Sequence, residues 1–322
     1  MNPLSWAIVG PGAIAQQFAE AMTAMGRQVA AVGARNREKG EAFAQRYGIG
    51  RVYDDFSLLF ADQAIDIVYI STPHASHYGL MKQALENGKH LLVEKAITVS
   101  SAELEEINQL AQAKNLIVAE AMTLFHMPLY HQLKTLADSG CLGKLKMIQV
   151  SFGSLKEDDP QNRFFNPALA GGALLDIGTY ALSFARFFMS EQPTEILTTA
   201  ERFVTGVDEQ SGIVLKNRRG EIATLALAFR ARMPKRGIVA WEKGFITVDD
   251  FPRAQQATLT WASGETELIE AGDTARALQY EIAALESWVA NGENPLHYLT
   301  NDVVAMMSEI RQRWGIHFPF EK

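Results

Sequence analysis

The sequence contains only one cysteine in 322 residues. Cys141 can therefore form no internal disulfide and no cysteine-based metal cluster, and we expect it to be a small apolar filler. The sequence also has no uninterrupted apolar run close to the roughly 20 residues that a membrane span needs. Residues 1–6 lack the charged and apolar regions of a signal peptide. We therefore expect a cytoplasmic protein without a membrane partner.

A long basic run is also absent, and the net charge is −7. Because nucleic acid and anionic membranes are bound by clustered Lys and Arg, neither is expected as a partner. Hydrophobic residues make up 48% and charged residues 21% of the chain, which is typical of a globular protein. The length is sufficient for two domains.

A glycine-rich turn follows the first apolar run, residues 5–9, and precedes a helical pattern. Gly10, Gly12 and Ala15 have the spacing of the Gly-x-Gly-x-x-Gly/Ala motif. Gly10 permits the tight turn, Gly12 lets the backbone approach a pyrophosphate, and Ala15 keeps the helix close to the strand. The helix N-terminus offers N–H groups to the phosphates. A plain glycine turn between a strand and a helix is the alternative interpretation.

The second predicted strand, residues 29–34, is followed by Arg35 and Arg37. A site for NAD usually has Asp or Glu here to bind the ribose 2′-hydroxyl, whereas Arg suits the 2′-phosphate of NADP. Glu38 is the nearest acid and is expected to open the next helix. The pattern favours NADP over NAD, with two solvated arginines as the alternative.

The first third of the chain continues as alternating strands and helices. This pattern predicts an α/β domain with a doubly wound parallel sheet, in which ligands bind beyond the carboxyl ends of the strands. The predicted strands are residues 65–71, 90–93 and 116–119, and the predicted helices are 77–86 and 100–113.

Two loops follow strands of this sheet, residues 71–77 and the loop after Glu94-Lys95. Both are expected to line the cofactor crevice. His74 and His77 could indicate a metal, but no acid or cysteine stands near them in sequence. Helix capping or packing is therefore expected for His77, and no metal site is predicted.

After residue 120 the pattern changes to a run of strands with helices grouped apart, which predicts an α+β second domain. The domain boundary is expected near residues 120–125. Helices are predicted over residues 128–139, 173–189, 274–291 and 301–314, and strands over 145–155, 196–203, 211–215, 222–229, 236–241, 244–248 and 257–261.

One stretch of the second half stands out, residues 171–180. Its paired glycines allow another backbone or a ligand to come close, and Asp176 and Tyr180 share one face near a helix N-terminus. A tyrosine needs a nearby cation to act as a base near neutral pH, and Lys95 is the candidate. The alternative is a helix-start acid beside a half-buried core aromatic.

Four stretches together resemble the family of glucose-fructose oxidoreductase and inositol dehydrogenase (Gfo/Idh/MocA), in that family's order and spacing across almost the whole chain. Tyrosine at position 180 is more similar to the branch of dimeric dihydrodiol dehydrogenases and NADP-dependent sugar dehydrogenases. The family usually has proline after Glu-Lys, whereas this chain has Ala96, so a less firmly placed Lys95 is expected. The stretches are Gly10-x-Gly12-x-x-Ala15, Ser71-Thr72-Pro73-His74-x-x-His77, Glu94-Lys95 and Gly171-Gly172-Ala173-Leu174-x-Asp176-x-Gly178-x-Tyr180.

The resemblance implies a Rossmann domain of residues 1–122 and a second domain of residues 123–322 on an open, mostly antiparallel sheet. It implies hydride transfer between NADP (NAD possible) and a carbinol or carbonyl carbon of a sugar, polyol or cyclic diol. Members often dimerise through the sheet, so a homodimer or higher homo-oligomer is expected. Alternatives are a non-catalytic NAD(P)-binding sensor, like the family's repressor of galactose metabolism, and an imine or biliverdin-type reductase.

The resemblance also implies roles for single residues. Lys95 and Tyr180 serve acid–base chemistry, and Asp176 orients the substrate or Lys95. Candidate walls of the substrate pocket are Phe125, His126 and Phe164. Arg163 could reach the substrate, with a solvated loop arginine as the alternative. Candidate cofactor contacts are Gly10, Gly12, Ala13, Ile14, Arg35, Arg37, Ser71, Thr72, Pro73, His74, His77, Glu94 and Lys95.

Overall fold

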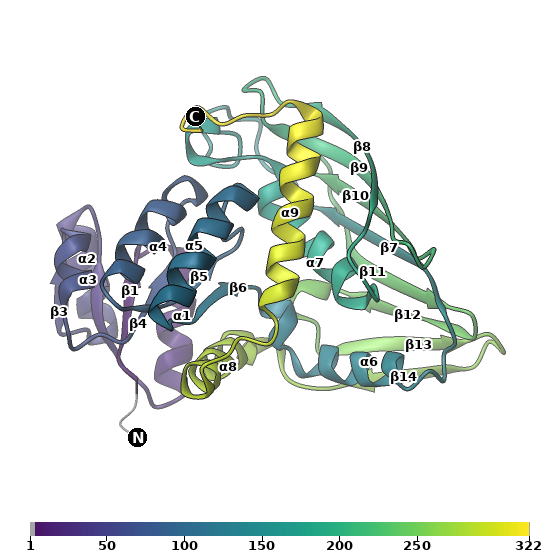
Figure 1. Cartoon of the computed structure of the whole chain (residues 1–322), viewed down its shortest axis with the longest axis horizontal. Helices are drawn as coiled ribbons and strands as arrows, with labels where there is room; N and C mark the ends of the chain where they lie inside the picture. The colour runs from purple at the N-terminus through teal and green to yellow at the C-terminus, as the bar shows by residue number, and fades with distance from the viewer. Residues whose placement is uncertain (1–3, 322) are drawn as a thin grey trace. The chain divides into compact units, whose positions relative to one another are not determined.

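The structure is a computed structural model that describes residues 4–321, and the chain forms two compact units (Figure 1). The first unit contains the chain up to Ala121 and, in addition, the later segment Leu278–His297. The second unit contains Met122–Ala277 and the chain from Tyr298 onward. The first change of unit lies near the expected boundary, but the return of Leu278–His297 to the first unit differs from the sequence-based division.

The first unit contains a parallel sheet with strand order β3-β2-β1-β4-β5-β6. Helices on both faces bury the sheet, which explains why β1 and β4 are apolar throughout. The predicted doubly wound α/β fold is confirmed, although the three-residue β3 escaped prediction. The strands are β1 (Trp6–Val9), β2 (Val29–Gly33), β3 (Arg51–Tyr53), β4 (Ile67–Ile70), β5 (His90–Glu94) and β6 (Val118–Ala121), and the helices are α1 (Ala13–Ala24), α2 (Arg37–Tyr47), α3 (Phe56–Ala61), α4 (His77–Glu86), α5 (Ser101–Lys114) and α8 (Ala277–Asn291).

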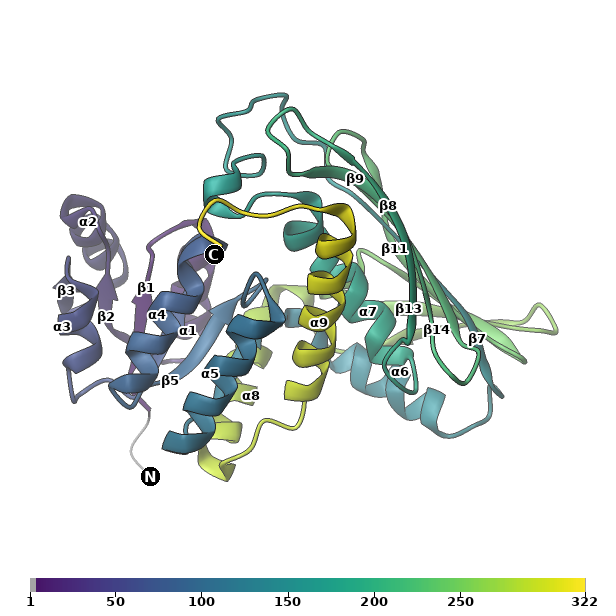
Figure 2. The same cartoon turned by 45° about the horizontal axis from the view of Figure 1, so that its top comes forward.

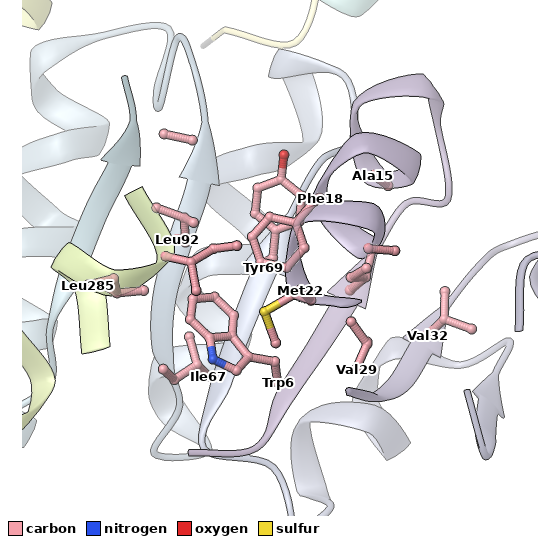
Figure 3. Close-up of a cluster of buried hydrophobic side chains, with 14 of the residues drawn as sticks. Trp6, Ala15, Phe18, Met22, Val29, Val32, Ile67, Tyr69, Leu92 and Leu285 are labelled. Atoms are coloured by element: carbon pink, nitrogen blue, oxygen red, sulfur yellow. The ribbon is translucent and has the colours of Figure 1, made fainter. Parts of the chain in front are cut away.

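The core of the first unit explains why α8 belongs to it (Figure 3). Phe18 of α1 stacks on Tyr69 of β4 with ring centroids 4.0 Å apart, and Trp6 packs beside Phe18. Leu285 of α8 is buried in the same cluster. The indole N–H of Trp6 also donates to Glu286 of α8 (3.0 Å). The bond between Trp6 and Glu286 joins residues 280 positions apart in the chain, which sequence periodicity cannot indicate.

The second unit contains an eight-stranded sheet in the order β14-β13-β12-β11-β7-β10-β9-β8. All neighbouring strands are antiparallel except β7 and β10, which run parallel. The predicted mostly antiparallel sheet is confirmed, although the exposed, polar β14 escaped prediction. The strands are β7 (Leu145–Gly153), β8 (Glu195–Arg202), β9 (Asp208–Lys216), β10 (Ile222–Ala228), β11 (Met233–Trp241), β12 (Gly244–Asp249), β13 (Gln256–Trp261) and β14 (Thr266–Glu270).

Helix α7 (Thr179–Phe188) packs on one face of this sheet, with α9 (His297–Trp314) on the same side (Figure 1, Figure 2). A Cβ on Gly237 of β11 would overlap the ring of Phe184, so only glycine allows this close packing. The segment Pro167–Phe188 is long and apolar enough to cross a membrane, but 78% of its most apolar window is buried within the protein. It is therefore the core helix of this unit.

The turn after α6 (Pro128–Asp138) corrects one expectation from the sequence. Cys141 lies in this turn between Gly140 and Leu142, and it is exposed. Its role as an apolar filler is therefore wrong, because a turn at the surface leaves the thiol outside the core.

Candidate active site

The glycine turn of the first unit leaves open space in front of the N-terminus of α1. Gly10 has a φ of +94°, and a Cβ there would lie 2.9 Å from the Thr72 side chain. Gly12, the N-cap of α1, has an ordinary φ of −86°, and a Cβ there would meet nothing within 4 Å. Neither packing nor backbone conformation demands glycine at position 12. The amides of Ala13 and Ile14 thus begin a helix with open space at its N-cap, the end of a helix that favours an anion.

The two arginines after β2 differ in their surroundings. Arg37 donates to Glu41 (Nε–Oε1, 2.8 Å) and Asp54 (Nη1–Oδ2, 3.4 Å), and these carboxylates raise its pKa. Arg35 is exposed, and within residues 4–321 its guanidinium forms no ion pair. Glu38 lies in the first turn of α2, as expected. Arg35 is therefore the cation with its charge available to an added phosphate.

The loop after β4 is tied to the glycine turn by Ser71. Its hydroxyl donates to the carbonyl of Gly10 (2.8 Å), and its N–H donates to the carbonyl of Val9 (2.9 Å). Thr72 accepts a hydrogen bond from the hydroxyl of Ser76 (2.8 Å), and Pro73 precedes the short helical turn that begins at His74. The loop therefore has a defined backbone at the carboxyl edge of the sheet.

His77 joins this loop to the loop after β5. The side chain is fully buried, with Nε2 2.8 Å from the carbonyl oxygen of Thr72. Its Nδ1 lies 3.1 Å from the carbonyl of Ala96 and 3.2 Å from that of Ile97. Burial lowers the pKa of His77, while its contacts with backbone carbonyls oppose this shift. Both nitrogens face backbone oxygens, which matches the expected packing role.

The loop that carries Lys95 is held by side chains on three sides. The Nε2 of His74 lies 3.1 Å from the carbonyl oxygen of Lys95, and the N–H of Ile97 donates to Glu120 (3.1 Å). His77 contacts the next carbonyls, as described above. The Lys95–Ala96 peptide bond is cis, and Ala96 is buried. The contacts of His74, His77 and Glu120 hold the backbone of this loop without a proline, contrary to the expectation of a loosely held Lys95.

Directly before Lys95, the carboxylate of Glu94 accepts a hydrogen bond from the hydroxyl of Tyr69 (2.5 Å). Tyr69 is itself buried in the core. This bond anchors the end of β5, and Lys95 follows with a half-buried side chain.

In the second unit, Asp176 and Tyr180 share the accessible face of a buried helix. Between Ala170 and Met189 they are the two residues that are not buried. Asp176 lies in a π-helical turn (Leu174–Gly178) rather than in the α-helix predicted there, and Tyr180 lies in the first turn of α7. π-Helical turns occur frequently at functional sites.

The paired glycines bring two other segments against the start of this helix. A Cβ on Gly171 would lie 2.7 Å from the carbonyl oxygen of Phe164. Gly172 has a φ of +120°, and a Cβ there would overlap the carboxylate of Asp208. The glycines therefore admit protein atoms, the first of the two possibilities that the sequence left open.

Asp208, at the start of β9, was not identified from the sequence. It is buried, and its Oδ2 accepts a hydrogen bond from the N–H of Leu174 (2.6 Å). Desolvation raises the pKa of Asp208 to about 6, while hydrogen bonds from the backbone oppose this shift. It therefore supports the first turn of the helix that carries Asp176 and Tyr180.

Lys156 was also missed. Its ammonium lies 3.9 Å from the carboxylate oxygen Oδ2 of Asp176 and 3.7 Å from the ring centroid of Phe164. Twenty residues separate Lys156 from Asp176, and no spacing rule links them. Arg163 stacks its guanidinium on the same Phe164 ring (4.1 Å) but is exposed.

Phe125 and His126 belong to the packed interior. Phe125 is 3% exposed, and its ring stacks on that of Phe187 (6.1 Å). Burial lowers the pKa of His126 to about 3.

A cleft of about 690 Å³ opens at the end of β7. Lys235 lines it, with its ammonium 5.4 Å from the ring of Phe152, and Phe152 packs against Tyr180 (6.1 Å). The cleft is lined by Gly153, Ser154, Leu155, Arg232, Met233, Pro234, Lys235 and Asp250. Among the described residues, no group of three His, Cys, Asp or Glu could hold a metal ion.

Comparison with known proteins covers both units. Residues 4–122 match the profile of an oxidoreductase family with an NAD-binding Rossmann fold, and residues 130–247 match the GFO/IDH/MocA C-terminal domain. The chain is 28% identical over 330 residues to a trans-1,2-dihydrobenzene-1,2-diol dehydrogenase of Xenopus laevis (98% of this chain, 99% of that protein). The Homo sapiens protein of that name is 27% identical over 343 residues (99% of each chain).

Solved structures share the fold. A 3-ketoreductase from Actinomadura kijaniata in complex with NADP and TDP-benzene has a TM-score of 0.86 and 22% identity, covering 97% of this chain and 98% of that chain. Levoglucosan dehydrogenase in complex with NADH and levoglucosan has a TM-score of 0.88 and 18% identity, covering 98% of this chain and 99% of that chain.

Proposed function

Because the chain belongs to the GFO/IDH/MocA oxidoreductase family, we propose that it transfers a hydride between NADP(H) and a carbinol or carbonyl carbon of a sugar, polyol or cyclic diol. The observation that carries this proposal is the accessible Asp176–Tyr180 pair on an otherwise buried helix. The diol dehydrogenases that match over their full length support the substrate class.

The first unit fits the dinucleotide. The open space at Gly12 and the N-terminus of α1 suit the pyrophosphate, and Arg35 suits the 2′-phosphate. NADP is therefore favoured, with NAD possible. When bound, the dinucleotide supplies the carbon that accepts or donates the hydride.

The protein's own groups handle the proton. Tyr180 takes the proton of the substrate hydroxyl in oxidation and returns it in reduction. A phenol has a pKa near 10, so a cation must favour the phenolate, and we assign this role to Lys95. Its charge also steadies the developing alkoxide, which can be worth several kcal/mol in a closed site. Asp176 holds a substrate hydroxyl.

The direct test is a panel of sugars, polyols, cyclic diols and dicarbonyls with NADP(H) and NAD(H), followed by absorbance at the nicotinamide band. We expect turnover with at least one member and a higher kcat/KM with NADP(H). Binding of the dinucleotide without turnover on any member would contradict the proposal and favour a sensor.

We also propose that the chain forms a homodimer through the sheet of the second unit. The face of the sheet opposite α7 has large, exposed apolar side chains, a pattern that marks interaction surfaces. Leu197 is 69% exposed and Leu268 is 61% exposed, at opposite edges of the sheet. The large exposed apolar side chains of this face are Met147, Leu197, Val214, Phe245 and Leu268.

Sedimentation velocity tests the dimer. We expect a dimer for the native chain and a monomer for Val214→Lys, which adds a charge to this face. Val204→Lys is the control, because Val204 is 83% exposed in the turn after β8. A monomeric native chain would contradict the proposal.

A cytoplasmic location is proposed as well. Recovery of activity in another cell fraction would exclude it.

A further inference from the structure

Lys156 has a backbone fixed on both sides. Its N–H donates to the carbonyl of Phe229 (2.7 Å), and its carbonyl accepts from the Nη1 of Arg230 (2.6 Å). Arg230 is itself held by Asp158 (Nη2–Oδ2, 3.1 Å). The start of the Lys156 side chain is therefore determined by the strand end of β10, not by the solvated loop in which the residue lies.

The side chain is guided by two aromatic rings. Its ammonium lies 3.7 Å from the ring centroid of Phe164 and 5.5 Å from that of Phe229, and the side chain is 18% exposed. The electron-rich faces of such rings attract a cation and compensate part of its lost hydration. The two rings thus favour a charged ammonium at this position.

The ammonium of Lys156 lies close to the carboxylate of Asp176. The ammonium and the Oδ2 of Asp176 are 3.9 Å apart, and the aspartate side chain is 14% exposed. A nearby opposite charge favours the ionised form of a carboxylate that is largely removed from water. Two arginines near the same loop have other partners: Arg230 pairs with Asp158, and Arg163 stacks on the ring of Phe164.

We propose that Lys156 is a positioning residue: it keeps Asp176 ionised and oriented beside Tyr180, so that Asp176 can bind a substrate hydroxyl. This inference rests on the proposed function, because it concerns the aspartate of the same site. Lys156 does not itself have to contact the reacting atoms.

The test is a double-mutant cycle with Lys156→Met and Asp176→Asn. Lys156→Met keeps the length of the side chain and removes its charge, and we expect kcat/KM to fall about tenfold. In the Asp176→Asn background, the same change should alter kcat/KM less than twofold, because the ion pair is already absent. An equal loss in both backgrounds would overturn the proposal.

Two further variants separate charge from structure. Lys156→Arg retains the cation and should recover most of the lost kcat/KM. Lys146→Met is the control, since Lys146 forms a comparable but solvated ion pair with Glu242 (2.9 Å) on the same unit, and it should leave kcat/KM unchanged. The acid limb of the kcat/KM profile should move to higher pH in Lys156→Met. An unmoved limb, or a loss no larger than in the control, would overturn the proposal.

The same cycle can be measured without turnover, from the midpoint of thermal unfolding at pH 7. Non-additive midpoints for the two changes support coupling between Lys156 and Asp176, and additive midpoints exclude it. If the protein turned over no substrate but the two changes were still coupled, the proposed function would be refuted while the ion pair between Lys156 and Asp176 would still be supported.

Discussion

In the first unit the candidate site is built mostly from backbone atoms, whereas in the second unit it is built from side chains. The first unit offers the backbone amides of the first turn of α1 and a loop whose carbonyl oxygens contact His74 and His77. The second unit offers Asp176 and Tyr180, supported by Lys156 and by a buried acid. Backbone sites need glycines at set spacings, so sequence motifs reveal them. Side-chain sites draw on distant segments, so motifs reveal only part of them.

The largest loss of stability is expected for a substitution at Gly172, where both the backbone conformation and a close side chain require glycine. Gly172→Ala combines a φ of +120° with an overlap on Asp208, and we expect a loss of about 4 kcal/mol in the free energy of unfolding. Gly206→Ala is the control, because Gly206 also has a positive φ (+92°) but meets nothing within 4 Å. Chemical denaturation measures both variants. Equal losses in the free energy of unfolding would show that the overlap with Asp208 does not contribute.

The buried carboxyl group of Asp208 should make the stability of the fold depend on pH. Asp208 has a pKa of about 6 in the folded chain and 3.8 as the ordinary value. Between these values the folded state retains a proton that the unfolded state has lost, so the free energy of unfolding falls as pH rises from about 4 to 6. The fall is about 3 kcal/mol when complete. Asp208→Asn should remove it, and unfolding curves at pH 4 and pH 7 measure the difference. Parallel pH dependence in both proteins would contradict this prediction.

Tyr180→Phe tests the chemical role of the second unit. We expect turnover to fall about 10²-fold or more, because the general base is removed, while binding of NADPH to the first unit stays intact. Stopped-flow reduction and fluorescence titration measure the two quantities separately. Unchanged turnover would remove Tyr180 from the mechanism.

Arg35→Ala tests the first unit. We expect the Kd for NADPH to rise about tenfold, since a charge-assisted contact to the 2′-phosphate is lost, while the Kd for NADH stays nearly constant. Arg37→Ala should have a smaller effect, because Glu41 and Asp54 already engage Arg37. Titration calorimetry with both cofactors measures the ratio. Equal losses for NADPH and NADH would mean that the 2′-phosphate is bound elsewhere.

Much of the fold could be predicted because it follows from local patterns. The buried strands of the parallel sheet are continuous apolar runs, and the helix predicted over residues 77–86 matches α4. The family resemblance is confirmed by the matches over residues 4–122 and 130–247. Of the two missed strands, β3 is only three residues long and β14 is mostly exposed, and both have little apolar pattern.

The sequence alone determined the dinucleotide-binding turn, the alternation of strands and helices, and the placing of Asp176 and Tyr180 on one helix face, because each depends on residues close together along the chain. The tertiary structure alone decided that α8 packs into the first unit, that His77 contacts the Lys95 loop, that Lys156 lies beside Asp176, and that Asp208 accepts a hydrogen bond from the start of the Asp176–Tyr180 helix. Each of these depends on contacts between segments 19 to 280 residues apart. Such contacts are set by packing and by the pairing of buried polar groups, and no local pattern encodes them.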